Sequence, residues 1–354
     1  MMNAGRPFGG KVMVLWGDFR QVLPVVPKAS RAGVVRACIK RSPLWPLFRV
    51  FHLTENMRVL ANGDNQRLMD WDAFLLELSN GARPTIGDTD YVELPAELCV
   101  AIDNTSKESL ERSQREFIHE VYPDLKRNYA NMEADELRGW LSERGILAPK
   151  NDAVDELNAI CLDMLPGEEN ICLSADSVLH EEQAAAFPAE FLNSMRATGM
   201  PPHRLVLKPG CMLMMLRNLS KRSGLCNGTR LIFEGVQGMY LLKCKIASGE
   251  HKGVHVLIPR ILTQPSDFRG HPCEWRRQQF PVRVAYAMTI NKSQGQTFQR
   301  AGVWLESPVF SHGQLYVAAS RVGHPDGIKF AIAPAANTPP RFATKNVVYS
   351  TTKC

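Results

Sequence analysis

Apolar residues recur along this chain in two different patterns. Within residues 66–81, and again within 109–122, they lie three or four positions apart, which predicts two amphipathic helices. Shorter apolar runs at 11–16 and 49–58 predict strands. Residues 144–167 combine a short apolar run, an Asn or Asp cap, a helical pattern and a Pro-Gly stop, which predicts a strand followed by a helix.

The pattern changes at residue 204. From there to 263, short apolar runs are separated by Pro-Gly, Asn-Gly and Gly-rich turns, which predicts a small antiparallel barrel or sandwich. Strands alternating with helices return at 281, beginning with a single strand over FPVRVAYAMTI. The all-β block is therefore predicted to be an insertion in a domain of the α/β class. Residues 166–202 are acidic and polar, and we expect a surface excursion there.

Composition excludes few of the possible folds and functions. The 354 residues suffice for two or three domains, and the net charge of +6 permits a polyanionic partner without requiring one. Nine cysteines include no C-x-x-C pair, so we expect no metal site, no disulfide framework and a reducing compartment. No apolar stretch reaches membrane-spanning length, and the N-terminus has no signal-peptide pattern.

Residues 5–12, GRPFGGKV, nearly match the phosphate-binding loop G-x-x-x-x-G-K-[ST]. Val12 stands where a metal-binding hydroxyl is needed, and an apolar run follows in place of a helix. A Gly-rich turn that leads into a strand is the better interpretation.

Four polar clusters fall at predicted strand or helix ends: 17–21, 54–58, 289–297 and 320–321. A Gln amide both donates and accepts, and the planar fork of Arg suits a polyphosphate. The strand-to-helix turn at 289–297 offers N–H and hydroxyl groups to a phosphate backbone. Each cluster also has an ordinary structural explanation, such as a surface charge, a helix cap or an Arg at a helix C-terminus.

Five stretches occur in a fixed order: GDFRQVLPV, LTENMR, GLCNGTRL, YAMTINKSQGQT and QLYVAASRV. Together they resemble the later motifs of the petite-integration-frequency (PIF-type) helicases, including those of Helitron-type transposons. These are superfamily-one DNA motors related to RecD. The resemblance implies two RecA-like P-loop NTPase helicase domains, the first one partial, with an SH3-like all-β insertion in the second.

The resemblance also implies a role for each matched residue. Gln21 would sense the γ-phosphate and couple it to DNA, while Arg58 and Arg321 would reach the phosphates as catalytic arginines. The residues implied on the nucleotide side are Gly17, Asp18, Gln21, Arg58, Gly295 and Arg321. The residues implied along the DNA strand are Thr289, Asn291, Lys292, Ser293, Gln294 and Thr297.

The same comparison divides the chain into domains. We expect a C-terminal part of the first RecA-like domain, the second RecA-like domain in two halves, the SH3-like insertion, a basic linker and a tail. In chain order the boundaries are 1–62 for the first domain, 63–203 for the first half of the second, 204–263 for the insertion, 264–280 for the linker, 281–335 for the second half and 336–354 for the tail.

In this family an F-G-G-K-x-V run leads into the GDFRQ stretch, so Lys11 is not expected to be the phosphate lysine. The Walker A loop and the acidic Walker B pair are expected upstream of Met1. The sequence would then be truncated by gene-model error or transposon decay, and the chain alone should not hydrolyse ATP.

The function implied by the resemblance is ATP-dependent 5′-to-3′ unwinding of DNA in repair, recombination and telomere maintenance. The implied cofactors are ATP and Mg²⁺, the partners are single-stranded and duplex DNA, and the location is the nucleus or, alternatively, the mitochondrion. The sequence leaves the oligomeric state open. A second possibility is a non-catalytic remnant of a transposon helicase that binds single strands through the basic-aromatic stretch WRRQQFPVR at 275–283.

Overall fold

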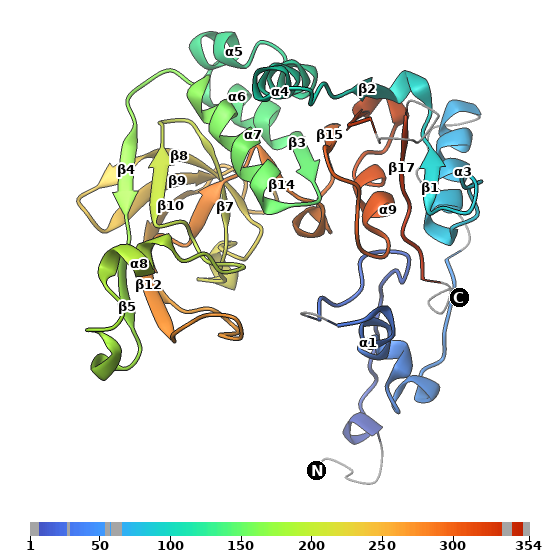
Figure 1. Cartoon of the computed structure of the whole chain (residues 1–354), viewed down its shortest axis with the longest axis horizontal. Helices are drawn as coiled ribbons and strands as arrows, with labels where there is room; N and C mark the ends of the chain where they lie inside the picture. The colour runs from blue at the N-terminus through green and yellow to red at the C-terminus, as the bar shows by residue number, and fades with distance from the viewer. Residues whose placement is uncertain (1–6, 27–28, 54–56, 58–65, 335–341, 350–354) are drawn as a thin grey trace. The chain divides into compact units, whose positions relative to one another are not determined.

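The computed structural model describes most of the chain (Figure 1). The described residues are 7–26, 29–53, 57, 66–334 and 342–349. They form two compact units. The first comprises Met1–Asn104, Ser293–Gln299 and Val303–Cys354, and the second comprises Thr105–Lys292 and Arg300–Gly302.

The first unit is built from short helices and strands. Its helices are α1 (Arg31–Arg36), α3 (Gln66–Asn80) and α9 (Gln314–Ala319). Its 3₁₀ turns are η1 (Pro7–Gly10), η2 (Ile39–Arg41), η3 (Trp45–Leu47), η4 (Ala96–Leu98) and η8 (Pro325–Gly327). Its strands are β1 (Tyr91–Glu93), β2 (Cys99–Ala101), β16 (Ile328–Ile332) and β17 (Ala343–Lys345). Strand β1 pairs antiparallel with β17, and β2 pairs in parallel with β16.

Helix α3 confirms the amphipathic helix predicted over 66–81. It buries Leu68, Trp71, Phe74 and Leu78, which recur at helical spacing on one face. Gly81 follows the last turn with a φ of 61°. That left-handed conformation favours glycine and ends many helices.

The predicted strand at 11–16 is not found. These residues pair with no strand among those that the structure describes, and Val12 and Trp16 are 91% and 93% exposed. A strand of a parallel sheet is held by neighbours on its edges and by helices on its faces. The apolar run here has neither, so its periodicity alone does not make it a strand.

The second unit contains most of the helices and strands. Its helices are α4 (Lys107–Val121), α5 (Leu125–Asn131), α6 (Ala134–Ser142), α7 (Asn151–Asp163) and α8 (Ala189–Ser194). Its strands up to residue 237 are β3 (Arg144–Ala148), β4 (Asn170–Leu173), β5 (Ala175–Val178), β6 (Arg204–Leu207), β7 (Met212–Met215) and β8 (Arg230–Gln237). The strands that follow are β9 (Leu241–Ile246), β10 (His255–Pro259), β11 (Ile261–Thr263), β12 (Trp275–Gln279), β13 (Val282–Val284) and β14 (Ala287–Thr289). The 3₁₀ turns are η5 (Glu181–Gln183) and η6 (Lys221–Ser223), and η7 (Ile290–Ser293) and strand β15 (Arg300–Leu305) are each divided between the two units.

The α/β part of the second unit confirms the strand-and-helix unit predicted at 144–167. Strand β3 pairs in parallel with β14, and helices α4 and α7 both contact β3 (Figure 1). Asn158 on α7 locks this arrangement, because its side chain donates to the carbonyl of Ala287 at 2.9 Å and accepts from the amide of Ala287 at 2.8 Å. The fold class is α/β, as predicted.

The predicted all-β block is also present. Strands β10, β9, β8, β7 and β13 form one five-stranded sheet in that order, with antiparallel pairing throughout (Figure 1). The single strand predicted over FPVRVAYAMTI is wrong in one respect. It divides into β13, which pairs with β7 of this sheet, and β14, which pairs with β3. Residues 285–286 therefore carry the chain from the all-β sheet to the α/β part.

The segment 166–202 is predicted to be a surface excursion and the segment 264–280 a basic linker. Instead they contribute strands β5 and β12 to one three-stranded sheet with β11. Five buried residues from the two segments form a common hydrophobic core: Val178, Leu192, Met195, Cys273 and Trp275. Two segments far apart in sequence thus make one small folded layer.

A buried arginine joins the all-β sheet to the α/β part within the second unit. Arg230, the first residue of β8, is only 3% exposed. Its guanidinium donates to the carbonyls of Ser142 at 3.0 Å, Arg144 at 2.9 Å and Ala285 at 3.3 Å. Since these acceptors end α6, begin β3 and precede β14, Arg230 fixes the sheet against all three elements.

Candidate functional site

The 17–21 turn lies in the first unit and carries three residues predicted on the nucleotide side. The Asp18 carboxylate accepts from the amide of Arg20 at 3.0 Å and from the side-chain amide of Gln21 at 3.5 Å. The amide of Gln21 donates to the Asp18 carbonyl at 3.2 Å. Gly17 is exposed with open space around it, and Gln21 is half-buried. Asp18 therefore organises the turn that presents Gln21.

Helix α9 holds this turn. The hydroxyl of Tyr316 donates to the Asp18 carboxylate at 3.0 Å. Burial, followed by the negative charge of Asp18, raises the pKa of Tyr316 to about 12. The phenol therefore stays protonated at neutral pH and remains a donor to the turn.

The residue after α9 and its C-cap, Arg321, is predicted to be the second γ-phosphate arginine and is buried, with 7% of its surface exposed. Its Nη1 donates to the carbonyls of Ser293 at 3.3 Å and Gln296 at 3.0 Å, and its Nε donates to the carbonyl of Val317 at 2.8 Å. The structure thus brings Arg321 against the predicted 293–297 turn. Through these hydrogen bonds the Arg321 guanidinium holds that turn in place.

The residues predicted along the DNA strand differ in exposure. Gln294 and Thr297 are exposed, whereas Thr289, Asn291 and Lys292 are half-buried and Ser293 is completely buried. Gly295 has a φ of 83°, which a residue with a side chain rarely adopts. Arg58 lies outside the described residues.

A cationic cluster in the second unit surrounds one of these predicted residues. Burial, then the neighbouring charges of Arg283 and Arg217, lowers the pKa of Lys292 to about 8. Across the described residues, Lys292 has no carboxylate partner, although Arg283 forms an ion pair with Asp155. Arg217 donates to the carbonyl of Gln264 at 3.4 Å. A half-buried ammonium among other cations, with no acid to neutralise it, is an arrangement that a bound anion would stabilise.

Sequence reasoning found Lys292 and missed Arg217, and it included Arg283 only in the basic-aromatic stretch at 275–283. Arg217 follows strand β7, and Arg283 lies in the middle of β13, which pairs with β7. The only signal was a single arginine next to apolar residues, just after β7 for Arg217 and within β13 for Arg283. That signal becomes informative only when the pairing is known.

The basic-aromatic contact predicted at 275–283 is wrong for two of its side chains. Trp275 is completely buried in the hydrophobic core of the small layer, so it cannot stack on a base. The buried Asp176 carboxylate accepts hydrogen bonds from Arg277 with both of its oxygens, at 2.6 Å from Nη2 and 2.9 Å from Nε. These residues stabilise the fold and are not available to a nucleic acid.

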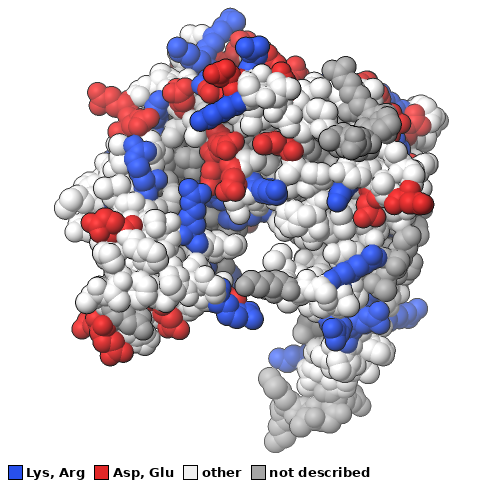
Figure 2. Space-filling model, viewed as in Figure 1, with Lys and Arg blue, Asp and Glu red and all other residues white. Residues whose placement is uncertain are grey.

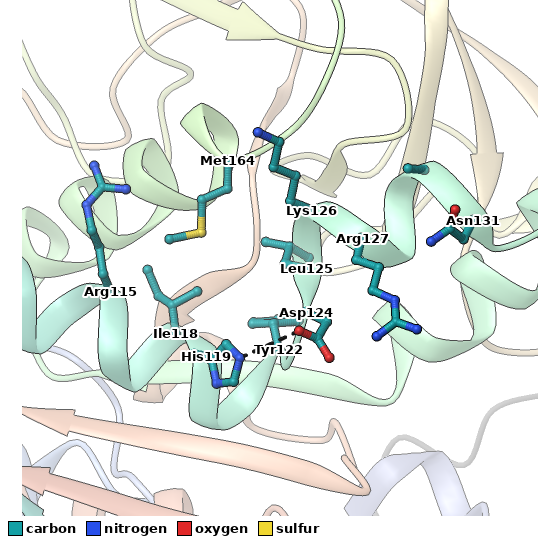
Figure 3. A pocket seen from close by; sticks show the side chains of 11 residues that line it. Arg115, Ile118, His119, Tyr122, Asp124, Leu125, Lys126, Arg127, Asn131 and Met164 are labelled. Carbon is teal, nitrogen blue, oxygen red and sulfur yellow. Dashed lines mark ion pairs between the residues drawn. The ribbon is translucent and has the colours of Figure 1, made fainter.

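A surface hollow of about 570 Å³ lies where helices α4 and α5 meet the end of α7 (Figure 3). Ile118, Leu125 and Met164 contribute apolar side chains to it, while His119 and Asp124 form an ion pair at 3.9 Å at its edge. On the face drawn in Figure 2, Lys and Arg side chains are interspersed with Asp and Glu over much of the surface, and a group of Lys and Arg without Asp or Glu lies toward the lower right. The cations Lys126 and Arg127 at the hollow are exposed, whereas Lys292 is half-buried beside the charges of Arg283 and Arg217.

Two other kinds of site are not found within the described ranges. None of the helices there combines the length and the apolar character needed to cross a membrane. The same residues contain no group of three His, Cys, Asp or Glu side chains that could hold a metal ion.

Two family models match the sequence. The model described as PIF1-like helicase matches residues 1–88, and the model described as DNA helicase Pif1, 2B domain, matches residues 190–235. The first match includes the 17–21 turn. The second begins before the five-stranded sheet and ends within β8.

Curated relatives match most of the chain at low identity. The ATP-dependent DNA helicase PIF1 of Homo sapiens is 28% identical over 326 residues, covering 92% of this chain and 41% of that protein. The same helicase of Xenopus laevis is 26% identical over 330 residues, covering 91% and 41%. The ATP-dependent DNA helicase RRM3 of Saccharomyces cerevisiae is 25% identical, covering 89% and 45%. The chain therefore spans about two fifths of the length of these relatives.

Solved structures agree on the fold. The Pif1 helicase of Candida albicans matches with a TM-score of 0.55 and 23% identity, covering 98% of this chain and 68% of that one. The Pif1 helicase of Bacteroides in complex with ADP-AlF3 and ssDNA matches with a TM-score of 0.59 and 18% identity, covering 98% and 66%. With two family models matched and relatives aligned along nearly all of its length, the chain is similar to the PIF1-like helicases in sequence and in fold.

Proposed function

We propose that this chain supplies the DNA-gripping and phosphate-sensing parts of an ATP-dependent 5′-to-3′ DNA helicase. One observation carries the proposal. Lys292 is half-buried beside Arg217 and Arg283, has no carboxylate partner among the described residues, and lies in the stretch that resembles the family's fifth motif. A single strand's phosphates are the anions that such a cluster fits.

The curated relatives support the wider activity, since they are named ATP-dependent DNA helicases. By that likeness we place the protein in DNA repair, recombination and telomere maintenance, and in the nucleus. The five-stranded antiparallel sheet would be the SH3-like insertion of the second RecA-like domain. Thr289, Asn291, Gln294 and Thr297 would lie along the same strand of DNA as Lys292.

On the nucleotide side, we assign Gln21 to the terminal phosphate and Arg321 to the same group. Helix α9 connects them, because Tyr316 holds the turn that carries Gln21 and Val317 accepts from Arg321. Gly17, Asp18 and Gly295 would shape the backbone around the phosphates, and Arg58 would contribute from outside the described residues. When bound, ATP would supply the free energy for movement along DNA.

The described residues do not provide a complete nucleotide site. They offer Mg²⁺ no set of three acidic, His or Cys ligands, so we derive no step through the metal. They do offer the phosphates a side-chain amide at Gln21 and the hydrogen-bonding groups of the 293–297 turn.

Binding of fluorescently labelled single-stranded DNA to the whole chain, measured by anisotropy across a salt series, tests the proposal. We expect affinity to fall as salt rises, because counterions are released from the DNA. Lys292→Gln should weaken binding and reduce the slope of log K against log salt by about 0.7, the value for one phosphate contact on a single strand.

Lys126→Gln is the matched control. It removes the same charge from an exposed position on α5, at the hollow drawn in Figure 3. This variant should bind DNA as the unaltered chain does. An equal loss of affinity in both variants would show that net charge, and not the Lys292 cluster, governs binding.

DNA binding should also depend on pH through Lys292. Its pKa of about 8 in the free protein is raised when a phosphate contacts the ammonium, so DNA binding takes up a proton above pH 8. Affinity should be level below that pKa and fall by up to about tenfold per pH unit above it. Anisotropy titrations at constant ionic strength, across about three pH units centred on this pKa, should show the fall, and Lys292→Gln should abolish it. A level profile for the unaltered chain would contradict the assignment.

A further inference from the structure

His312 lies just before α9 and is almost completely buried, with 1% of its surface exposed. Its Nδ1 accepts a hydrogen bond from the backbone amide of Tyr349 at 2.9 Å, and its Nε2 lies 3.1 Å from the carbonyl oxygen of Phe19. An amide donor at Nδ1 requires that nitrogen to be unprotonated. The proton is therefore on Nε2, which donates to Phe19, and only the neutral ring satisfies both partners.

The partner on one side belongs to the turn that presents Gln21. Phe19 lies in the middle of the 17–21 turn. Two residues close to His312 in sequence, Gly313 and Tyr316, contact the same turn. Gly313 has a φ of 71°, and a Cβ atom at this position would overlap the carbonyl oxygen of Arg20. Together with the bond from Tyr316 to Asp18, residues 312–316 contact the turn at three points.

The partner on the other side belongs to a C-terminal strap, residues 342–349. This strap is anchored independently of the turn. Strand β17 pairs with β1, the amide of Asn346 donates to the carbonyl of Asp90 at 2.8 Å, and its side chain donates to the carbonyl of Leu78 at 2.9 Å. The Tyr349 ring stacks on His312 with a centroid separation of 5.2 Å. His312 thus connects an anchored strap to the phosphate-sensing turn.

We propose that His312 is a positioning residue that fixes the 18–21 turn against the C-terminal strap, and thereby sets where Gln21 is presented. The inference rests on the proposed role of Gln21 at the terminal phosphate. A strap that pairs with β1 at one end and holds the turn at the other limits how far Gln21 can move.

The surroundings keep the ring in the required state. Burial is the main cause that lowers the pKa of His312, and the positive charge of Arg31 lowers it further, while the Phe19 carbonyl and Asp18 oppose the shift. The guanidinium of Arg31 lies over the Tyr349 ring, 4.6 Å from its centroid. Two other ionisable side chains contact the turn: Tyr316, which is held protonated as described above, and Lys40, whose ammonium lies 4.3 Å from the centroid of the Phe19 ring.

Hydrogen exchange of the full chain, measured by mass spectrometry without nucleotide, tests the connection. His312→Ala should speed exchange in residues 17–23 by about five- to tenfold, the effect of losing one buried hydrogen bond. Exchange in helix α7, in the second unit, should not change. His312→Gln should restore the slow exchange, because its amide can donate to Phe19 and accept from Tyr349.

A second pair of variants separates the two halves of the connection. Tyr349→Pro removes the donor to Nδ1, whereas Tyr349→Ala keeps that donor and removes only the ring. We expect Tyr349→Pro to speed exchange at 17–23 more than Tyr349→Ala does. Unchanged exchange at 17–23 in His312→Ala, or a failure of His312→Gln to restore it, would overturn the proposal.

The exchange experiment gives a different result if the proposed role of Gln21 at the terminal phosphate is wrong. If Gln21 does not contact nucleotide, added ATP will leave exchange at 17–23 unchanged in the unaltered chain, while the effects of the variants without nucleotide will persist. If His312 does not position the turn, the variants will have no local effect, whatever ATP does.

Discussion

Replacing Asp176 with Ala should lower the free energy of unfolding of the small β5–β12–β11 layer by about 3–5 kcal/mol. The Asp176 and Arg277 side chains are 0% and 2% exposed, and removal of the carboxylate leaves a buried guanidinium without its counter-charge. Backbone carbonyls of Pro201, Leu192, Asn193 and Met195 accept from Arg277 but carry no full charge. Urea unfolding followed by tryptophan fluorescence should show an earlier transition, since Trp275 lies in this layer.

The exposed pair Asp267–Arg269 provides the control. It has the same two residue types, but its side chains are 34% and 80% exposed. Asp267→Ala should change stability far less than Asp176→Ala does, as is usual for a surface pair. The double variant Asp176→Leu with Arg277→Met should recover much of the loss, because it removes both charges together. Equal effects of Asp176→Ala and Asp267→Ala would contradict the importance of burial.

Helices α3, α4 and α7 could be predicted from the sequence because each repeats its apolar positions over several turns. The all-β sheet was predictable for a different reason, since its strands are separated by turn residues that permit few alternatives. Periodicity failed at 11–16. An apolar run becomes a strand only through pairing, and no pairing partner for it occurs among the described residues.

The small β5–β12–β11 layer could not be predicted from the sequence because it buries polar residues beside its hydrophobic core. Strand β12 buries Trp275, Arg277 and Gln279 on one face, and two of these three are residues that usually lie in water. The burial of Arg277 depends on Asp176, which lies far away in the sequence on β5. A pattern within one segment cannot reveal a charge pair completed by another, so the segment was predicted to be a linker.

The residues of the candidate site also form two groups, those that the sequence identifies and those that only the structure identifies. Lys292, Gln21 and Arg321 stood in motifs whose order could be recognised, whereas the proximity of Arg217 and Arg283 became visible only when strands β7 and β13 were paired. The buried position of Ser293 also could not be predicted, because it results from the packing of the turn that Arg321 holds. Motif order identifies which segments meet, while packing decides which side chains remain available to a ligand.

Arg230→Met should both destabilise the second unit and weaken binding of single-stranded DNA, although Arg230 itself is buried. The substitution leaves the carbonyls of Ser142, Arg144 and Ala285 without their donor. Buried acceptors without partners cost about 1–3 kcal/mol each, so the three carbonyls together should cost about 3–9 kcal/mol in the free energy of unfolding. Methionine occupies similar space without adding a polar group, which limits the change to the lost donor.

The expected effect on DNA binding follows from the elements that carry the three cations of the cluster. Arg283 lies in β13 of the all-β sheet and Arg217 follows its strand β7, whereas Lys292 follows β14 of the α/β part. Arg230 fixes the sheet against that part, so its loss should separate the cations and reduce the salt dependence of binding, measured by anisotropy. Arg222→Met, at an exposed position on η6 of the same unit, is the control for stability and should leave the unfolding transition unchanged. If Arg230→Met lowers stability but leaves the salt slope intact, the cluster does not depend on this junction, and Lys292 alone would carry the contact with DNA.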